Sequence, residues 1–343
     1  MSKVRTVEDA LRQLEEMAAQ FSGKKVEPSA EAKKQAAAYN AAFWETMHTG
    51  MPQNGLKIGS DGAGGYLVPD TYEKKLVKAL AERNVIRQIA TTIPTTHKLH
   101  IPVSYGVGDA TWVIEGQPWS FSEASFGEVV LDAHKLATAI LASDEMLEDG
   151  GIDLEKHIQD FFAERIGEAE EEAFIQGNGK GKPLGLIYQA AVGAMTADEG
   201  DISLDDMINL EYSVSQPYRQ HAVWLISEDA YGRLRRIRHY DGRPLWNNNL
   251  QEGEPQKLFG YPIYVCTALD KVAPGSIPVM FGDFRNYWIG DRGKRVIKRL
   301  VERYADRGQV AFITTERVDA KLVLPDAVKM LKVSGTPVAE PEE

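Results

Sequence analysis

The chain has 343 residues, and its hydrophobic content of 43% is enough to bury one or two sizeable cores. Its formal net charge of −11 has the opposite sign to that of a free-standing DNA-reading protein. No apolar run approaches the roughly 20 residues that cross a bilayer, and the first residues carry no apolar stretch of a secretion signal, so no membrane partner is expected. Cys266, the single cysteine, leaves no internal disulfide, and its strand-like setting favours a buried thiol over a nucleophile.

Residues 1–50 predict two amphipathic helices joined by a polar segment. The first follows a capping box at Thr6–Asp9, and its apolar stripe is spaced by three and four residues: Leu11, Leu14, Ala18 and Phe21. The second runs from Ala30 to His48. Because neither helix has enough apolar surface to fold alone, we expect an arm that needs a partner. The alternative is a helical hairpin on the surface of the main body.

Residues 50–69 are rich in glycine and predict a flexible connection, followed by a helix over 71–84. Apolar and polar residues then alternate at Leu99, Ile101 and Val103 and again over 126–131 and 136–141, as strands require. We expect residues 97–131 to form a long two-stranded ribbon with a broad tip. Because such a ribbon is marginal alone in water, it predicts obligate assembly with a covering partner.

The longest predicted helix spans Ile152–Gln176, about 37 Å, between an N-cap at Asp153 and a stop at Gly177. Its apolar stripe follows helical spacing: Leu154, Ile158, Phe161, Phe162, Ile166, Ala169, Ala173 and Phe174. Its acidic and polar residues are expected on the opposite, solvated side: Glu155, Gln159, Asp160, Glu168, Glu171 and Glu172. We therefore expect a spine across which other elements lie.

The remainder predicts a compact α/β unit and a set of closing strands. Helices are expected at 204–214 and 227–238, with strands at 222–226, 261–265, 278–281 and 287–289. A long polar loop spans 239–257, and loops of this length are usually functional or disordered. Further strands at 309–318, 321–324 and 328–333 precede a solvated tail.

No catalytic, cofactor or metal constellation emerges from the motifs. The GNGKGK stretch at 177–182 follows a helix rather than a strand and precedes Pro183, so it is a helix stop and not a phosphate loop. His97 and His100 point to opposite faces of a predicted strand and cannot share a metal. The basic clusters lie at 233–238 and 292–303. They could contact nucleic acid, but arginine is also enriched at protein interfaces, and we favour an interface.

In their order, these segments resemble the major capsid proteins of tailed bacteriophages, from about Phe43 to Val333. SDGAGGYLVP (60–69) resembles the start of the mature shell segment, and ATWVIEG (110–116) with FGEVVLDAHKLATAILASDEMLED (126–149) resembles one arm of the extended loop and the short helix after it. The spine GIDLEKHIQDFFAERIGEAEEEAFIQGNG (151–179) and KPLGLI (182–187) follow. VWLISEDAYGRLRRIRHYDGRPLW (223–246), LFGYPIYV (258–265) and FGDFRNYWIGDR (281–292) continue the likeness.

The resemblance implies an α+β capsid fold with a peripheral domain holding the spine helix and an antiparallel sheet, an axial α/β domain, an extended two-stranded loop and an N-terminal arm. It divides the chain into a scaffold-like segment (1–50), N-arm and first helix (51–94), extended loop (95–133), peripheral domain with spine (134–200), axial domain (201–294), peripheral closing strands (295–335) and tail (336–343). The scaffold helix would use Leu11, Leu14 and Phe21, and the spine core would use Leu154, Ile158, Phe161, Phe162, Ile166 and Phe174.

The implied function is structural, not enzymatic: self-assembly into homo-pentamers and homo-hexamers of an icosahedral shell around double-stranded DNA, which is held by non-specific contact. Implied partners are a portal protein, a maturation protease and decoration proteins, with procapsid assembly in the host cytoplasm before DNA packaging and a final place in the virion capsid. Subunit interfaces are expected at Trp112, Glu115, Trp119, Arg233, Arg236, Arg243, Trp246 and Arg295.

Two alternatives stay open at this point. An encapsulin compartment shares the fold but encloses protein, and the amphipathic arm favours the phage. A nucleotide-handling enzyme would use the 177–182 loop.

Some members of the capsid family link their subunits covalently through a lysine, an asparagine and a glutamate. Here no lysine lies between Lys98 and Lys135, and Gly308 and Thr315 stand where the other two would fall, so no covalent linkage is expected.

Overall fold

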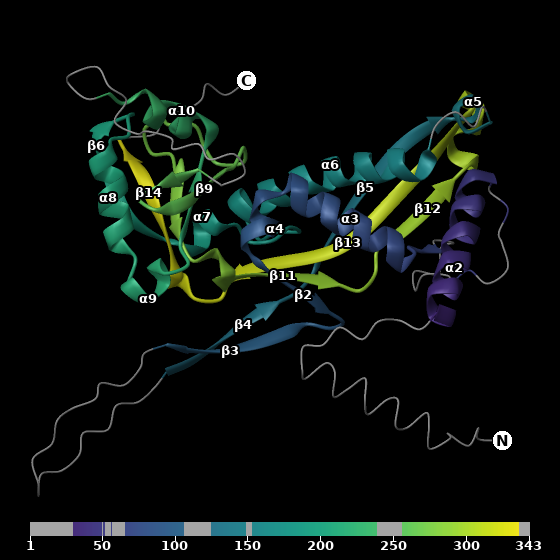
Figure 1. Cartoon of the computed structure of the whole chain (residues 1–343), viewed down its shortest axis with the longest axis horizontal. Coiled ribbons are helices and arrows are strands. Elements are labelled where there is room, and N and C mark those ends of the chain that lie inside the picture. The colour runs from purple at the N-terminus through teal and green to yellow at the C-terminus, as the bar shows by residue number, and fades with distance from the viewer. Residues whose placement is uncertain are drawn as a thin grey trace, which may run out of the picture.

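A computed structural model describes residues 30–49, 51, 56, 66–105, 125–148, 153–238 and 256–335 (Figure 1). The first expected helix, the tip of the ribbon and most of the 239–257 loop lie outside these residues. Helices and strands mix in two six-stranded sheets and one two-stranded ribbon, so the expected α+β class is confirmed.

The first sheet is built around one long strand, β13 (Gln309–Leu322). One edge of β13 pairs antiparallel with β5 (His134–Ser143). The other edge pairs with β12 (Val296–Leu300) and then with β11 (Tyr287–Arg292). The short strands β1 (Tyr66–Leu67) and β2 (Thr91–Thr95) complete the sheet at its two ends. The two strands expected at 309–318 and 321–324 are therefore one.

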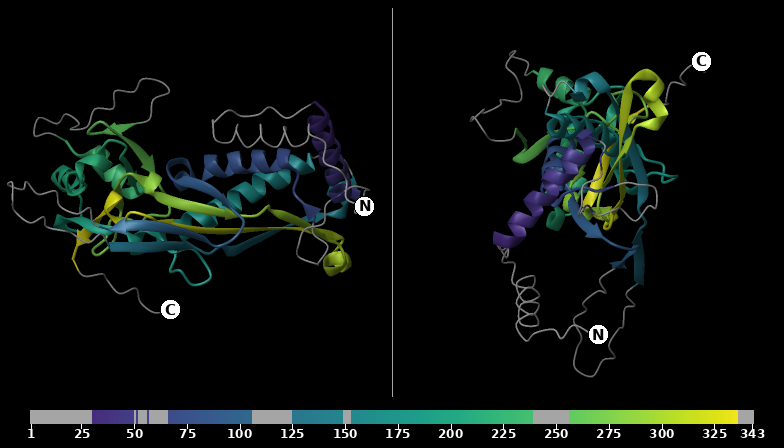
Figure 2. Two further views of the ribbon diagram at one scale, coloured as in Figure 1. Left: turned by 90° about the horizontal axis from the view of Figure 1, so that it is seen from below. Right: turned by 90° about the vertical axis from the view of Figure 1, so that its right-hand side faces the viewer.

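Helices α6 (Leu154–Gln176) and α3 (Asp70–Arg83) lie along one face of these strands, as Figure 2 shows. The Asp153 side chain accepts a hydrogen bond from the backbone N–H of Lys156 at 3.1 Å, so the expected N-cap is confirmed. Every fourth residue of α6 enters the core, including Ile158, Phe162 and Ile166, which contact Ile140 and Phe312 of the sheet through one apolar cluster. Phe161 is only partly buried, at the margin of that cluster.

Helix α2 (Ala30–Thr49) corrects the expectation that residues 1–50 stand apart from the body. Phe43 and Met47 are fully buried beside Tyr72 and Leu76 of α3, in the cluster that also contains the core residues of α6. The Trp44 ring lies 5.0 Å from that of Tyr72. Since the sequence shows only a narrow apolar stripe here, its burial by α3 could not be read locally. The second helix is part of the folded body.

The second sheet has the order β6-β14-β10-β7-β9-β8. Its strands are β6 (Ala191–Glu199), β7 (Val223–Ile226), β8 (Lys257–Leu258), β9 (Tyr261–Val265), β10 (Val279–Gly282) and β14 (Val328–Ser334). Helices α8 (Leu204–Ser213) and α10 (Glu228–Arg236) cover one face around Trp224 and Phe281. The other face meets the end of α6 through a second cluster that includes Phe174 and Met280.

Sheet membership does not follow the expected domain boundaries. Strand β11 lies in the first sheet although it was assigned to the axial unit (201–294). Strands β6 and β14 lie in the second sheet although they were assigned to peripheral segments. The chain crosses between the sheets more often than the order of local patterns reveals, because hydrogen bonding between distant strands leaves no local signal.

The shorter elements connect these layers. They are α4 (Val85–Ile89), α5 (Asp144–Glu148), α7 (Leu186–Gln189), α9 (Gln216–Arg219) and the 3₁₀ turns η1 (Phe284–Asn286), η2 (Glu302–Arg307) and η3 (Pro325–Ala327). Strands β3 (Leu99–Tyr105) and β4 (Ser125–Leu131) pair antiparallel as the expected ribbon. Ile101, Val103 and Leu131 contact Val323 at its base, and the ribbon then leaves the body (Figure 1 and Figure 2).

Candidate functional site

The residues expected at subunit interfaces divide into three groups. Outside the described residues lie Trp112, Glu115, Trp119, Arg243 and Trp246, together with Leu11, Leu14 and Phe21 of the expected scaffold helix. Arg233 and Arg236 lie on α10, where Arg236 is exposed. Arg295 is buried inside the body, so the structure does not bring these residues together in one surface.

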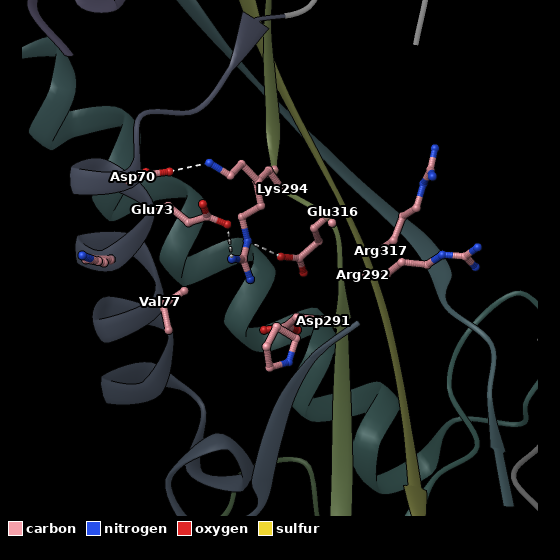
Figure 3. Close-up of a pocket in the computed structure, with 12 residues that line it drawn as sticks. Asp70, Glu73, Val77, Asp291, Arg292, Lys294, Glu316 and Arg317 are labelled. Atoms are coloured by element: carbon pink, nitrogen blue, oxygen red, sulfur yellow. Dashed lines mark hydrogen bonds and ion pairs between the residues drawn. The ribbon is translucent and has the colours of Figure 1, made fainter. Parts of the chain in front are cut away.

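Arg295 is an internal ion-pair partner rather than a surface residue. Its Nε donates to Glu316 Oε2 at 2.7 Å, and its guanidinium lies 3.9 Å from Glu73 (Figure 3). Only 5% of the residue is exposed. Its low exposure and its internal ion pairs place it inside the body, so the structure does not support the expected role of Arg295 at a subunit interface.

Arg295 belongs to a buried charge cluster that we define as Arg87, Glu170, Asp291, Arg295 and Glu316. Arg87 donates to both oxygens of Glu170, at 2.6 and 2.5 Å, and to both oxygens of Asp291, at 3.1 and 2.9 Å. Burial alone would raise the pKa of Asp291, but the charge and hydrogen bonds of Arg87 outweigh it and hold that pKa below its usual range.

Glu316 is the group in this cluster that lacks a full set of partners. Its Oε1 is buried and faces no hydrogen-bond donor. Desolvation first, and then the charge of Glu170, raise the pKa of Glu316 to about 8, in spite of the attraction of Arg295. A proton on Glu316 would let its hydroxyl donate to the Glu170 carboxylate. The cluster has three carboxylates for two guanidiniums, so one retained proton balances its charge.

Glu171, which follows Glu170 in α6, is also buried, and this corrects its expected place on the solvated side of the spine. Its carboxylate accepts from the backbone N–H of Val85 at 2.9 Å and from Cys266 Sγ at 3.1 Å. Burial, and then the charge of Glu171, raise the pKa of the Cys266 thiol. This confirms Cys266 as a core thiol.

The acidic residues of α6 that are exposed are spaced by four: Asp160, Glu164, Glu168 and Glu172.

The buried charge cluster lies between two apolar clusters, one around Phe162 and Phe312 and the other around Phe174 and Ile289. Its members pair with one another, so its chemistry is that of an internal ionic contact. Within the described residues, no group of three or more His, Cys, Asp or Glu side chains is placed to hold a metal ion. None of the described helices has the length and hydrophobicity needed to span a membrane.

One hollow opens beside the buried charge cluster, with a volume of about 400 Å³ (Figure 3). Its wall joins α3 to the β11–β12 turn, where Lys294 Nζ donates to Asp70 at 2.5 Å. Glu316 lines its inner part, and Val77 lies at the wall formed by α3. Charges of both signs alternate around it, so it presents no single electrostatic preference.

The 177–182 loop is a helix stop, as expected. A side chain at Gly177 would bring its Cβ to 2.1 Å from the carbonyl oxygen of Pro183, so only glycine fits where α6 ends. Asn178 pairs with Leu184 to close the loop. Lys180 is exposed, and the loop follows a helix rather than opening one, which is not the arrangement of a phosphate loop.

Comparison with known proteins shows which protein family has this fold. Residues 64–333 match the phage capsid family. The chain belongs to the phage capsid family. It is similar to the major capsid protein of Escherichia phage T5, with 24% identity over 316 residues that cover 85% of this chain and 67% of that protein.

Solved capsid structures extend the likeness. The capsid-family chain is similar to the capsid of an empty GTA particle computed with C5 symmetry, at 27% identity and a TM-score of 0.64, covering 74% of this chain and 90% of the other. The capsid of the native GTA particle gives 25% identity, a TM-score of 0.65, and coverage of 83% and 95%. The expected capsid fold is thereby confirmed, since nearly the whole of each capsid subunit is matched.

Sequence reasoning missed the buried charge cluster of this capsid-family chain, although one signal for it was present. Glu170 is four residues from both Ile166 and Phe174, so it continues the buried stripe of α6. We expected the glutamates to form a solvated face because charge runs on long helices usually do. A glutamate on the apolar stripe, with Arg87 and Arg295 elsewhere in the chain, is what a buried ion pair requires.

Proposed function

We propose that the chain is the major capsid protein of a tailed bacteriophage, which self-assembles into the pentamers and hexamers of an icosahedral shell around double-stranded DNA. The observation that carries the proposal is the match of residues 64–333 to the phage capsid family, together with coverage of 90–95% of two capsid subunits. Its role is structural rather than enzymatic. It works in the virion capsid, after assembly in the host cytoplasm.

The described surface supports self-association. The β3–β4 ribbon leaves the body with only its base packed, and isolated ribbons are marginal in water. Strand β6 is an edge of the second sheet and exposes Val192 and Met195. Unpaired strand edges with apolar side chains invite pairing with another chain, so neighbouring subunits are the natural cover for both features.

The proposed partner inside the shell is double-stranded DNA, held without sequence preference. The exposed acidic stripe of α6 (Asp160, Glu164, Glu168 and Glu172) would repel phosphates and leave the packaged DNA free to slide if this face lines the interior. A portal protein, a maturation protease and decoration proteins complete the proposed set of partners, by analogy with the family.

Sedimentation and negative-stain microscopy of the purified chain test the proposal directly. We expect capsomers or closed shells whose fraction rises with protein concentration, because association follows mass action. A stable, monodisperse monomer at every concentration, both alone and with the products of neighbouring genes, would refute the capsid function. Shells that enclose a protein instead of DNA in infected cells would favour an encapsulin compartment.

A further inference from the structure

Helix α8 presents one exposed stripe that no other described residue of the chain covers. Asp205, Ile208, Asn209 and Tyr212 follow one another at spacings of three, one and three and share the outward side of the helix. The inward side carries Met207 and Leu210, which are fully buried. Tyr212 is 68% exposed although Arg219 lies over one face of its ring, so the α8 stripe ends in a protruding aromatic group, about two helical turns from the carboxylate of Asp205 in the first turn.

Helix α10 presents a hollow with the opposite charge. The hollow has a volume of about 540 Å³. Its lining has a net positive charge, because the basic side chains outnumber the acidic ones: Arg233, Arg235, Arg236 and Lys271 against Glu228 and Asp229. Arg235 lies over the ring of Tyr231, at 5.6 Å from the ring centroid. Tyrosine and arginine are among the residues most enriched at the energetic centres of protein interfaces, which lie in well-packed pockets.

Gly232 is a second, independent indication that α10 binds a side chain of another molecule. Glycine in the middle of a helix costs roughly 0.5–1 kcal/mol relative to alanine. A Cβ built on Gly232 would meet no atom within 4 Å, so nothing in the described chain requires glycine there. Glycine at this position deepens the hollow between Tyr231 and Arg235, and it permits the close approach of a side chain from another molecule.

The two surfaces lie on different flanks of the same sheet. In Figure 1, α8 runs along the left-hand flank of the second sheet and α10 lies above it, while both pack on the cluster around Trp224. A closed ring of identical chains needs this arrangement, because each copy must offer one surface and receive its neighbour on a different one. Both compared capsids were solved with C5 symmetry, which places their copies around such an axis.

We propose that the α8 stripe of one subunit docks in the α10 hollow of the next, with Tyr212 over Gly232 and Asp205 facing Arg235 or Arg236. The inference rests on the proposed capsid function and specifies which surfaces of the second-sheet unit form its ring contact. The acidic turn matches the basic hollow in charge, and the protruding tyrosine matches the glycine gap in shape. Other occupants of the hollow, such as DNA, are outcomes of the test.

A cysteine pair tests the contact without background, because the single native thiol, Cys266, is fully buried. Tyr212→Cys and Gly232→Cys are combined in one chain, shells are assembled, and they are oxidised before denaturing electrophoresis without reductant. A head-to-tail contact brings the two Cα atoms within about 7 Å and predicts a ladder of linked chains. Each single variant should give monomers, because a head-to-tail contact pairs two different surfaces. Normal shells that show no ladder, or a single variant that gives dimers, would overturn the proposal.

Charge reversal supplies the second measurement. Asp205→Lys and Arg235→Glu should each lower the yield of shells by about tenfold or more, and the double variant should restore it. Gly232→Trp should block assembly while leaving the circular dichroism spectrum unchanged, and Gly232→Ala is the matched control that adds little bulk. If both single charge-reversal variants assemble normally, the proposal is overturned. It is also overturned if Arg235→Glu forms normal shells that have lost affinity for a short DNA duplex, because the hollow would then bind DNA rather than a neighbouring subunit. Failure of the unmodified chain to assemble would instead count against the capsid function.

Discussion

Replacing Glu316 by glutamine tests whether the buried charge cluster holds a proton. Glu316→Gln keeps the shape of the side chain and supplies an amide N–H that can donate to Glu170, as the hydroxyl of a protonated Glu316 would. The substitution removes one titrating group and leaves Arg87, Asp291 and Arg295 in place. The comparison of the two proteins across pH therefore isolates the proton on Glu316.

The direction of the effect follows from the raised pKa. Burial raises the pKa of Glu316 from 4.5 to about 8, so between these values the folded chain binds a proton that the unfolded chain has released. The free energy of unfolding contributed by this group is therefore highest below pH 4.5, falls as pH rises toward 8, and is constant above it. At 1.36 kcal/mol for each pH unit, the whole loss is at most about 5 kcal/mol.

Urea unfolding of both proteins, at one concentration and a series of pH values, measures this difference. We expect the two free energies of unfolding to agree near pH 4.5 and the variant to become more stable by several kcal/mol at pH 8 to 9. Titrating groups outside the buried charge cluster are common to both proteins and cancel. Glu302→Gln, on the exposed η2 turn, is the control and should leave the pH dependence unchanged. A variant less stable than the unmodified chain at pH 9, or a difference that does not change with pH, would refute the reasoning.

The remaining predictions concern the spine, the arm and covalent linkage. Glu171→Ala should lower the free energy of unfolding by about 1–3 kcal/mol, because it leaves the Val85 N–H and the Cys266 thiol without their acceptor. Glu172→Ala is the control and should change the free energy of unfolding little. Equal denaturation midpoints for the two variants would show that the burial of Glu171 is unimportant. Phe43→Ala should cost roughly 3–5 kcal/mol in thermal or urea unfolding, although deletion of residues 2–29 should leave the body folded; a harmless Phe43→Ala would place α2 outside the core. Mature particles boiled in detergent should run as single chains, and a ladder of linked species would reveal another linking pair.

Local periodicity predicted the elements whose apolar pattern is complete within one segment. The spacing from Leu154 to Phe174 placed the spine, and the alternation at Leu99, Ile101 and Val103 placed the first strand of the ribbon, because each pattern reports one buried face directly. The same reasoning failed for Phe43 and Met47, whose stripe is too narrow to show whether a distant helix covers it. Their burial depends on α3, which no pattern within residues 30–49 encodes.

The candidate site was less predictable than the fold, because charge has no periodic signature of burial. Arg295 looks the same in sequence whether it faces solvent or Glu316, and only the pairing of β12 with β13 decides between them. Glu170 was the exception, since its position on the stripe of α6 marked it as internal. The assignment of β11 to the first sheet likewise depends on hydrogen bonds to β13 and β2, far from it in the chain.

The position of the buried charge cluster along α6 has a mechanical consequence. A helix that touches a sheet only through methyl and phenyl groups can slide along it, since such contacts are short-ranged but not directional. A slide of α6 by one turn, about 5.4 Å, would take Glu170 away from Arg87, which keeps its bonds to Asp291, and leave the Glu170 carboxylate buried without its partner. The ionic contact, made through Arg87 of α4 to Asp291 of β11, therefore sets the longitudinal register of the spine against the first sheet, and a wall built from many such subunits resists shear at that point in every copy.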